Sequence, residues 1–487
     1  MTTHILAIDQ GTTSTRAIAF DLAFKPCATA QVALTQHFPQ PGWVEHDADE
    51  IWAATIDVCR QVIAAVGGAD KIACIGITNQ RETTIVWDRE TGRPLHRAIV
   101  WQDRRTADVC ARMRGDGIEP RVQEKTGLLL DPYFSATKLK WILDHLDARD
   151  VERACFGTVD SHLLFRLTGG RVHATDATNA SRTMLYDINA RRWDEGLCAI
   201  FDAPRAMLPT VRASAGEFGE TEPNLFGRSI PITGVAGDQQ AALFGHGCFR
   251  PGMAKATYGT GCFLMMNMGR APPRSRNRLL ATVGYAVGDD FAYALEGSIF
   301  SAGATMQWLR DGLRLIKDSA ESEAMAASLP DNGGVYLVPA FAGLGAPQWN
   351  AQARGAIVGL TRDSRAEHVV RAGLEAVAYQ TADLIAALRA DGAPPISSLL
   401  VDGGLTANAW AMQFLSDVCD VEVVRPAFQE VTALGAARLA ATGAGLSSDV
   451  PAAIGNRTWR PSMPNEKRGE LMERWRAAVA GVEAAGS

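Results

Sequence analysis

Apolar segments that alternate with polar turns open the chain. Residues 5–8 and 16–20 are β-rich, and the segment between them, 10–15, carries a glycine and four hydroxylated residues. This order predicts a hairpin with an unusually polar tip. Residues 72–101 repeat the pattern, because the run IACIGIT leads into NQRE and is followed by TTIVWD and AIVW. We therefore expect polar and charged side chains to collect where these strands end.

A second hairpin of this kind lies near the middle of the chain. Residues 231–247 predict a strand that enters a helix, and the stretch after them predicts a hairpin whose tip is the Gly-Thr-Gly of residues 259–261. This tip is similar to the Gly-Thr-Thr of residues 11–13. We expect each half of the chain to present one such hairpin.

The second half of the chain is predicted to alternate between helices and strands. Apolar residues recur at helical spacing over residues 366–390, which predicts a long helix with Arg371 and Arg389 facing water. A strand ending at Asp402 is followed by a helix, a strand and a further helix up to residue 441. This alternation predicts an α/β fold.

The length of the chain predicts two large domains. A chain of 487 residues exceeds the size at which one hydrophobic core keeps growing, so a cleft between two domains becomes possible. We place the boundary near Pro251, which gives domains of residues 1–249 and 250–487. The hydrophobic share of 47% and the charged share of 21% are typical of a folded globular protein.

Charge and cysteine patterns argue against several classes of protein. A formal net charge of -6, with no local cluster of Lys and Arg, offers no field for a nucleic-acid backbone. The nine cysteines include no CxxC pair, which indicates reduced, buried thiols. The sequence has no basic segment followed by an apolar stretch at its start and no apolar run of about 18 residues. We expect a cytoplasmic protein without stable membrane insertion.

The two hairpin tips are candidate phosphate-binding segments. The sequence contains neither GxxxxGK[ST] nor GxGxxG. Tips without bulky side chains can bind phosphate through backbone N–H groups, with hydroxyls as further donors. Asp9, beside the first tip, could orient water around Mg²⁺ or be an ordinary turn residue. Arg16 could clamp a phosphate or lie in solvent on its strand.

Charged residues at two predicted strand ends suit hydroxyl chemistry. Asp238 could accept a hydroxyl proton during phosphoryl transfer, with Gln239 holding a second hydroxyl, or it could simply cap the following helix. Arg81 and Glu82 offer a donor and an acceptor for vicinal hydroxyls, although a surface ion pair has the same pattern. Three aromatic residues could wall a polyol pocket or belong to the core: Trp101, Tyr133 and Phe263.

Taken together, these motifs resemble the glycerol kinases of the FGGY carbohydrate kinase family. The resemblance runs from about residue 4 to about residue 460 and rests on DQGTTSTR, GITNQRETTIVW, AIVWQDRR, DPYFSATK, GDQQAALFG, TYGTGCF and VDGG. VDGG is shared with the wider actin-like ATPase fold, whereas TNQRETTIVW with AIVWQ and DPYFS is specific to glycerol kinases. The resemblance implies two ribonuclease-H-like (actin-like ATPase) domains with a central cleft that holds ATP, Mg²⁺ and glycerol.

The resemblance also implies a role for each matched residue. Asp238 would be the general base, and it would support Mg²⁺ together with Asp9. The residues expected to contact glycerol are Arg81, Glu82, Trp101, Tyr133, Asp238, Gln239 and Phe263. The residues expected to contact the nucleotide are Thr12, Thr13, Ser14, Arg16, Thr260, Gly303, Gln307, Gly404 and Asn408. The implied reaction phosphorylates glycerol to sn-glycerol 3-phosphate, in a homodimer or homotetramer.

Two other functions are compatible with parts of the pattern. Another FGGY kinase, acting on a pentulose or a longer polyol, would share the ATP motifs but should differ around Arg81, Trp101 and Tyr133. An actin-like ATPase scaffold would hydrolyse ATP to change shape without phosphorylating a metabolite. A scaffold function does not account for the TNQRET and WQDRR segments.

Overall fold

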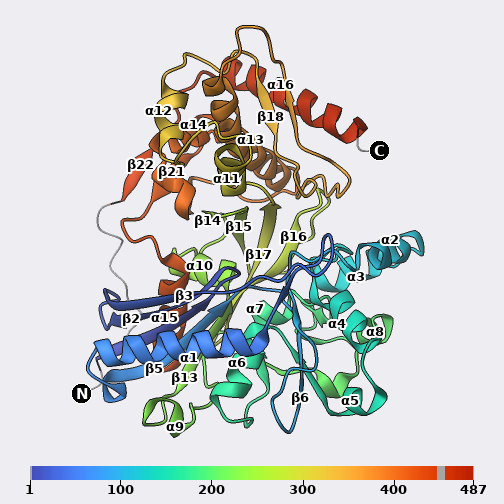
Figure 1. Cartoon of the computed structure of the whole chain (residues 1–487), viewed down its shortest axis with the longest axis vertical. Helices are drawn as coiled ribbons and strands as arrows, with labels where there is room; N and C mark the ends of the chain where they lie inside the picture. Colours follow the sequence, from blue (N-terminus) through green and yellow to red (C-terminus); the bar gives the residue numbers. More distant parts are fainter. Residues whose placement is uncertain (1–2, 447–455, 486–487) are drawn as a thin grey trace.

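Two mixed β-sheets, one in each lobe, organise the chain (Figure 1). The structure is a computed structural model that describes residues 3–446 and 456–485. The lobe coloured blue to green in Figure 1 contains the first sheet, and the lobe coloured yellow to red contains the second. Among the described residues, no helix has the length and apolar character needed to cross a lipid bilayer.

Five strands form the first sheet, in the order β13 (Ile232–Gly237), β5 (Ile72–Asn79), β1 (His4–Gln10), β2 (Ser14–Asp21) and β3 (Pro26–Ala33). The predicted N-terminal hairpin is confirmed, since β1 and β2 pair antiparallel. Strand β3 extends the hairpin on one side, while β5 and β13 run parallel to β1 on the other. The carboxyl ends of β1, β5 and β13 therefore meet at one edge of the sheet, where ligands of such sheets bind.

Seven strands form the second sheet, in the order β16 (Leu280–Val287), β17 (Asp290–Ile299), β15 (Cys262–Gly269), β14 (Ala254–Tyr258), β20 (Ser398–Asp402), β21 (Glu422–Arg425) and β22 (Arg457–Trp459). Its centre repeats the first sheet, because the hairpin β14–β15 has the antiparallel β17 on one side and the parallel β20 and β21 on the other. The two hairpin tips therefore occupy equivalent places in the two lobes, which gives their similarity a structural basis.

Helix α15 (Val431–Gly443) belongs to the second half of the chain but packs on the first sheet. It lies against β1, β5, β13 and helix α10 (Asp238–Gly245). Helix α1 (Ala48–Ala65) covers the opposite face beside β2 and β3. The approach of α15 is very close, because a Cβ at Gly76 would lie 2.2 Å from the backbone oxygen of Ala436. Alanine and glycine are needed at this contact.

The predicted long helix is α13 (Ala366–Ala390), but one of its residues was placed wrongly. Arg371 is buried rather than facing water, and its Nε donates to Glu375 Oε1 at 2.7 Å, one helical turn away. Arg389 is exposed, as predicted. The other helices of this lobe are α11 (Gly303–Asp311), α12 (Glu321–Ala327), α14 (Ala409–Cys419) and α16 (Asn465–Ala485).

The first lobe carries an additional, mainly helical region between β6 (Ile85–Asp88) and β13. Its helices are α2 (Ala107–Gly115), α3 (Glu119–Thr126), α4 (Ser135–Leu143), α5 (Ala148–Arg153), α6 (Val159–Leu167), α7 (Ala177–Ala180), α8 (Glu195–Ile200) and α9 (Pro223–Phe226). This region contributes Tyr133 and Arg182 to the site described below. Eight of the nine cysteines are buried as predicted, and Cys27 is exposed.

Candidate active site

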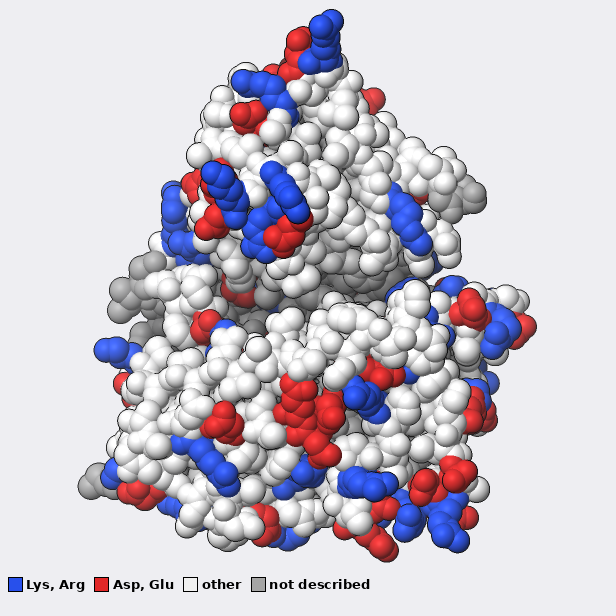
Figure 2. Space-filling model, viewed as in Figure 1, with Lys and Arg blue, Asp and Glu red and all other residues white. Residues whose placement is uncertain are grey.

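A cavity of about 410 Å³ lies between the two lobes. Figure 2 shows the surface hollowed where the lobes meet, with positive and negative side chains interspersed over the rest of this face. All seven residues predicted to contact glycerol line the cavity, together with four of the nucleotide set. The residues that line it are Thr12, Thr13, Gln36, Arg81, Glu82, Trp101, Gln102, Tyr133, Asp238, Gln239, Thr257, Gly259, Thr260, Gly261, Phe263 and Gln307.

The ends of two parallel strands place charged side chains in this cavity. After β5 the backbone turns sharply at Glu82, whose φ of +59° is a left-handed conformation that residues other than glycine rarely adopt. After β13 the helix α10 begins at Asp238, and its N-cap is Gly237. Asp238 is therefore not a simple N-cap. Its Oδ1 accepts a bond from the backbone N–H of Gln239 at 2.7 Å.

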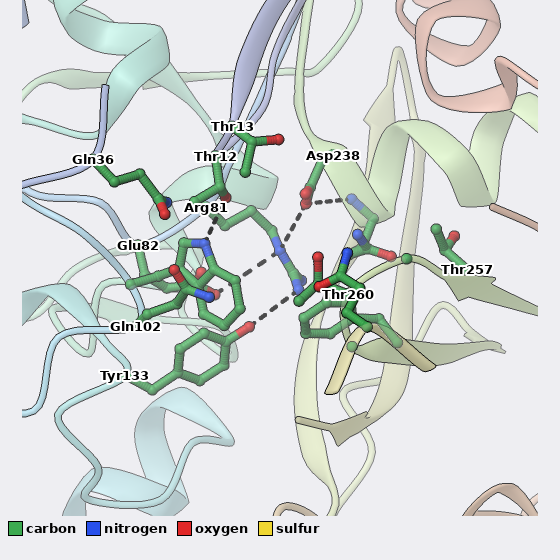
Figure 3. Close-up of a pocket in the computed structure, with 16 residues that line it drawn as sticks. Thr12, Thr13, Gln36, Arg81, Glu82, Gln102, Tyr133, Asp238, Thr257 and Thr260 are labelled. Carbon is green, nitrogen blue, oxygen red and sulfur yellow. Dashed lines mark hydrogen bonds and ion pairs between the residues drawn. The ribbon is translucent and has the colours of Figure 1, made fainter. Parts of the chain in front are cut away.

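Arg81 is fixed in the cavity wall by polar partners from both lobes. Its Nη1 and Nη2 donate to the two carboxylate oxygens of Glu296, at 2.5 and 3.2 Å. Its Nε lies 3.2 Å from Asp238 Oδ1, and its Nη2 donates to the Tyr133 hydroxyl at 3.4 Å (Figure 3). The alternative of a surface ion pair is wrong, because the side chains of Arg81 and Glu82 are only 2% and 1% exposed.

Arg182 completes a neutral set of four buried charges. Its Nε donates to Glu82 Oε1 at 2.6 Å, and its Nη2 donates to Glu296 Oε1 at 2.9 Å. Two arginines and two glutamates can be buried together because their charges cancel and each is hydrogen-bonded. Burial alone would raise the pKa of Glu296, but Arg182 and Arg81 lower it to about 2. For Glu82 burial outweighs the attraction of both arginines and raises the pKa.

Asp9 lies on β1 beside the first hairpin tip and interacts with Asp238. The pKa of Asp9 is raised to about 6, mainly by burial. The guanidinium of Arg16 opposes this increase, and the carboxylate of Asp238 adds to it. The two carboxylates predicted to support Mg²⁺ are thus close enough to repel each other. A divalent cation held by these carboxylates would oppose that repulsion.

The three predicted aromatic residues form one side of the cavity. Trp101 meets Tyr133 and Phe263 edge to face, with ring centroids 5.6 and 6.0 Å apart. Its indole Nε1 donates to the hydroxyl of Thr12 at 2.9 Å, which holds the first hairpin tip against the aromatic wall. Tyr133 also belongs to the hydrophobic core, and Trp101 and Phe263 pack against that core. That the three rings wall a polyol pocket stays a prediction.

The second hairpin tip is held by close backbone contact with the start of α11. The N–H of Gly303 donates to the oxygen of Gly259 at 2.9 Å, and that of Ala302 donates to the oxygen of Thr260 at 2.9 Å. A Cβ at Gly303 would lie 2.6 Å from the oxygen of Gly259, so this approach requires glycine. Thr260 and Gln307 line the cavity directly, whereas Gly303 supports the tip from behind.

Several predicted residues do not line the cavity: Asp9, Ser14, Arg16, Gly303, Gly404 and Asn408. Arg16 forms an ion pair with Glu430, just before α15, and its Nη2 donates to Gln31 Oε1 at 2.9 Å. Asn408 is the N-cap of α14, and its Oδ1 accepts a bond from the N–H of Ala411 at 2.9 Å. The structure thus gives Arg16 and Asn408 partners within the protein.

Sequence reasoning missed three buried charged residues of the site: Arg182, Glu296 and Lys255. The last two lie on the apolar strands β17 and β14, and Lys255 Nζ donates to Gln239 Oε1. A charged residue inside an apolar strand is a signal that could have found them, because a buried charge requires a partner. Arg182 follows the short helix α7 and has no such signal.

Comparison with known proteins defines the class of this chain. The model of the N-terminal domain of the FGGY family of carbohydrate kinases matches residues 4–245, and the model of the C-terminal domain matches residues 254–444. The chain therefore belongs to the FGGY family of carbohydrate kinases. The family expected from the sequence is confirmed.

Glycerol kinases are among the most similar relatives. The glycerol kinase of Rhodospirillum centenum is 56% identical over 486 residues, which cover 98% of this chain and 97% of that protein. Glycerol kinase 1 of Pseudomonas aeruginosa is 55% identical over 491 residues, with 99% of each chain covered. The crystal structure of Plasmodium falciparum glycerol kinase with ADP matches with a TM-score of 0.90 at 37% identity and 98% coverage of each chain. The predicted two-domain fold is confirmed.

Proposed function

We propose that this chain is a glycerol kinase, which transfers the γ-phosphoryl group of Mg-ATP to glycerol and yields sn-glycerol 3-phosphate and ADP. The observation that carries the proposal is the cavity in which Asp238 and the buried Arg81–Glu82 pair face two hydroxyl-bearing hairpin tips. A small polyol needs several fixed donors and acceptors, and these residues supply them. The full-length similarity to glycerol kinases supports the same substrate.

In the proposed reaction, Asp238 is the general base. The attacking hydroxyl loses its proton to the Asp238 carboxylate as its oxygen bonds to the γ-phosphorus, while the bond from that phosphorus to the leaving oxygen of ADP breaks. Arg81 Nε lies 3.2 Å from Asp238 Oδ1 and fixes the orientation of this carboxylate. Glycerol would be held by the hydrogen-bonding groups of Arg81, Glu82, Tyr133 and Gln239, with Trp101 and Phe263 against its carbons.

The nucleotide would lie between the two hairpin tips. Thr12, Thr13 and Thr260 line the cavity, and their hydroxyl and backbone N–H groups would bind the phosphates. Ser14, Arg16, Gly303, Gln307, Gly404 and Asn408 complete the proposed nucleotide set. Excluding water matters because water competes with the substrate hydroxyl as nucleophile. Closure of the two lobes over the bound substrates would meet this need.

The residues beside the first tip fit a magnesium site. Mg²⁺ takes one or two carboxylates together with water and phosphate oxygens, and the neighbouring Asp9 and Asp238 provide that donor set. When bound with ATP, Mg²⁺ would neutralise part of the charge on the phosphates. Asp9 would hold the metal through its hydration shell.

Coupled ADP release tests the proposed function. Purified protein with Mg-ATP is given glycerol, a pentulose or no acceptor, and the phosphorylated product is identified by mass. We expect ADP release that depends on glycerol, with glycerol 3-phosphate as product. Preference for the pentulose would keep the family and change the substrate, whereas ADP release without acceptor would indicate a nucleotide-driven scaffold. No ADP release with any acceptor would contradict the assignment of the site.

A further inference from the structure

A fully buried lysine lies directly behind the substrate cavity. Lys255 is on β14 and has no exposed surface, and its ammonium donates to Gln239 Oε1. It also donates to the hydroxyl of Thr257 at 2.9 Å and to the backbone oxygen of Phe263 at 3.4 Å. The three N–H groups of the ammonium therefore have three acceptors, which fixes the side chain in one position.

This contact decides which end of the Gln239 amide faces the substrate. An ammonium has no lone pair, so only the amide oxygen of Gln239, and not its NH₂ group, can face Lys255. Gln239 lines the cavity, and its Nε2 makes no hydrogen bond to any residue in the described ranges. The NH₂ group is therefore the end left for a ligand.

We propose that Lys255 is a positioning residue that fixes the Gln239 side chain as a hydrogen-bond donor toward a substrate hydroxyl. This inference rests on the proposed function, since it concerns how the same cavity recognises its polyol. With the amide fixed, the hydroxyl oxygen accepts the bond from Gln239 and its proton stays free for another acceptor. A freely rotating amide would offer its oxygen as often as its nitrogen.

A chain of hydrogen bonds holds Lys255 and connects it to both ends of α10. Thr257 accepts from Lys255 and donates to Asp402 Oδ2 at 3.2 Å, and His246 Nε2 lies 2.6 Å from the same oxygen. Gln239 is in the first turn of α10, and His246 is its C-cap. Burial lowers the pKa of Lys255, while Asp402 and Asp238 oppose this change. The ammonium of Lys255 is thus held by Thr257 and Phe263 as well as by Gln239.

The test is a double-mutant cycle of Lys255→Met and Gln239→Met, with the glycerol KM, the ATP KM, kcat and the calorimetric glycerol affinity measured for each variant. Lys255→Met should weaken glycerol binding and raise its KM about twofold or more, because a released amide presents its nitrogen to the ligand only part of the time, while the ATP KM is unchanged. In the Gln239→Met background the same substitution should have no further effect. An equal effect in both backgrounds, or none in either, would overturn the proposal.

Two further variants keep the test decisive if Lys255→Met folds poorly. Gln239→Glu retains the partner of Lys255 but presents an oxygen to the cavity, so we expect it to weaken glycerol binding; binding equal to that of the unsubstituted protein would overturn the proposal. Arg438→Met is the control, because Arg438 donates to the oxygens of Phe244 and Gly245 at the other end of α10. It should lower the melting temperature without changing the glycerol KM.

The wild-type protein separates this inference from the proposed function. If it phosphorylates no glycerol and binds none, the proposed function fails before Lys255 is tested. If it phosphorylates glycerol and the cycle shows no coupling, only the role of Lys255 fails.

Discussion

The charged wall of the cavity and the two hairpin tips are built by different means. The wall contains four buried charges from both lobes, Arg81, Glu82, Arg182 and Glu296, held by hydrogen bonds. The tips use hydroxyls and backbone N–H groups, and the second tip, residues 259–261, depends on a backbone approach that only glycine allows. Fixed charges suit the recognition of one small polyol, whereas backbone donors suit phosphate, whose oxygens are alike.

The largest effect should come from Asp238, the proposed base. Asp238→Asn keeps the shape of the side chain and one acceptor oxygen for the N–H of Gln239 but cannot accept the hydroxyl proton, so turnover should fall about 10²- to 10⁴-fold. Glycerol binding, measured by calorimetry, should persist. Near-normal turnover would show that the wall and tips alone carry catalysis.

Removing one charge from the wall should cost much of the stability. Glu296→Gln leaves Arg81 and Arg182 with Glu82 as the one carboxylate of the buried set, and we expect a loss of about 3–5 kcal/mol in the free energy of unfolding. Glu222→Gln, which breaks an exposed pair with Arg171, should cost about 1 kcal/mol or less. Chemical denaturation measures both. Equal losses would contradict the central role of the buried set.

Filling the space behind the second tip should have a smaller effect. Gly303→Ala places a methyl group 2.6 Å from the oxygen of Gly259, so we expect a loss of about 1–3 kcal/mol and a higher KM for ATP. The matched control is Gly469→Ala in α16, where a Cβ would meet nothing within 4 Å. That change should be neutral or slightly stabilising. Unchanged stability in Gly303→Ala would refute the close contact as a constraint on the tip.

The smallest effect concerns Asp9 and depends on pH. Its pKa rises from 3.8 to about 6 in the folded state, so the folded state holds the proton more tightly and stability is lost as pH rises through this window. Asp9→Asn removes that penalty and should stabilise the protein by about 1–2 kcal/mol at about pH 8, and by less at about pH 5. Thermal unfolding at both pH values measures the difference. The same gain in stability at both pH values would show that the gain does not arise from the raised pKa of Asp9.

The sequence predicted the parts of the site that lie in turns. Polar side chains at strand ends identified Arg81, Glu82 and Asp238, and glycine with hydroxyl residues identified both tips, because local chemistry is sufficient for these features. The alternation of strands and helices likewise predicted the α/β fold. The roles of these residues in binding and catalysis stay predictions until the variants are measured.

What the sequence did not reveal depends on contacts between distant segments. Glu296 meets Arg81 across 215 positions of the chain, and no spacing rule connects them. Arg371 was expected to face water because helical periodicity does not show that α12 and α14 cover that face of α13. The side-chain oxygen of Asn408 caps α14, and its expected contact with the nucleotide stays a prediction.

The return of α15 to the first sheet limits how this protein can be divided. The chain enters the second lobe after α10 and comes back over residues 431–443, whose alanines lie against the first sheet. A fragment ending near residue 250 would lack that cover and expose an apolar sheet face, while the complementary fragment would carry an unpartnered alanine-rich helix. Recombination between relatives could therefore exchange the two halves only if residues 431–443 were exchanged together with the first half.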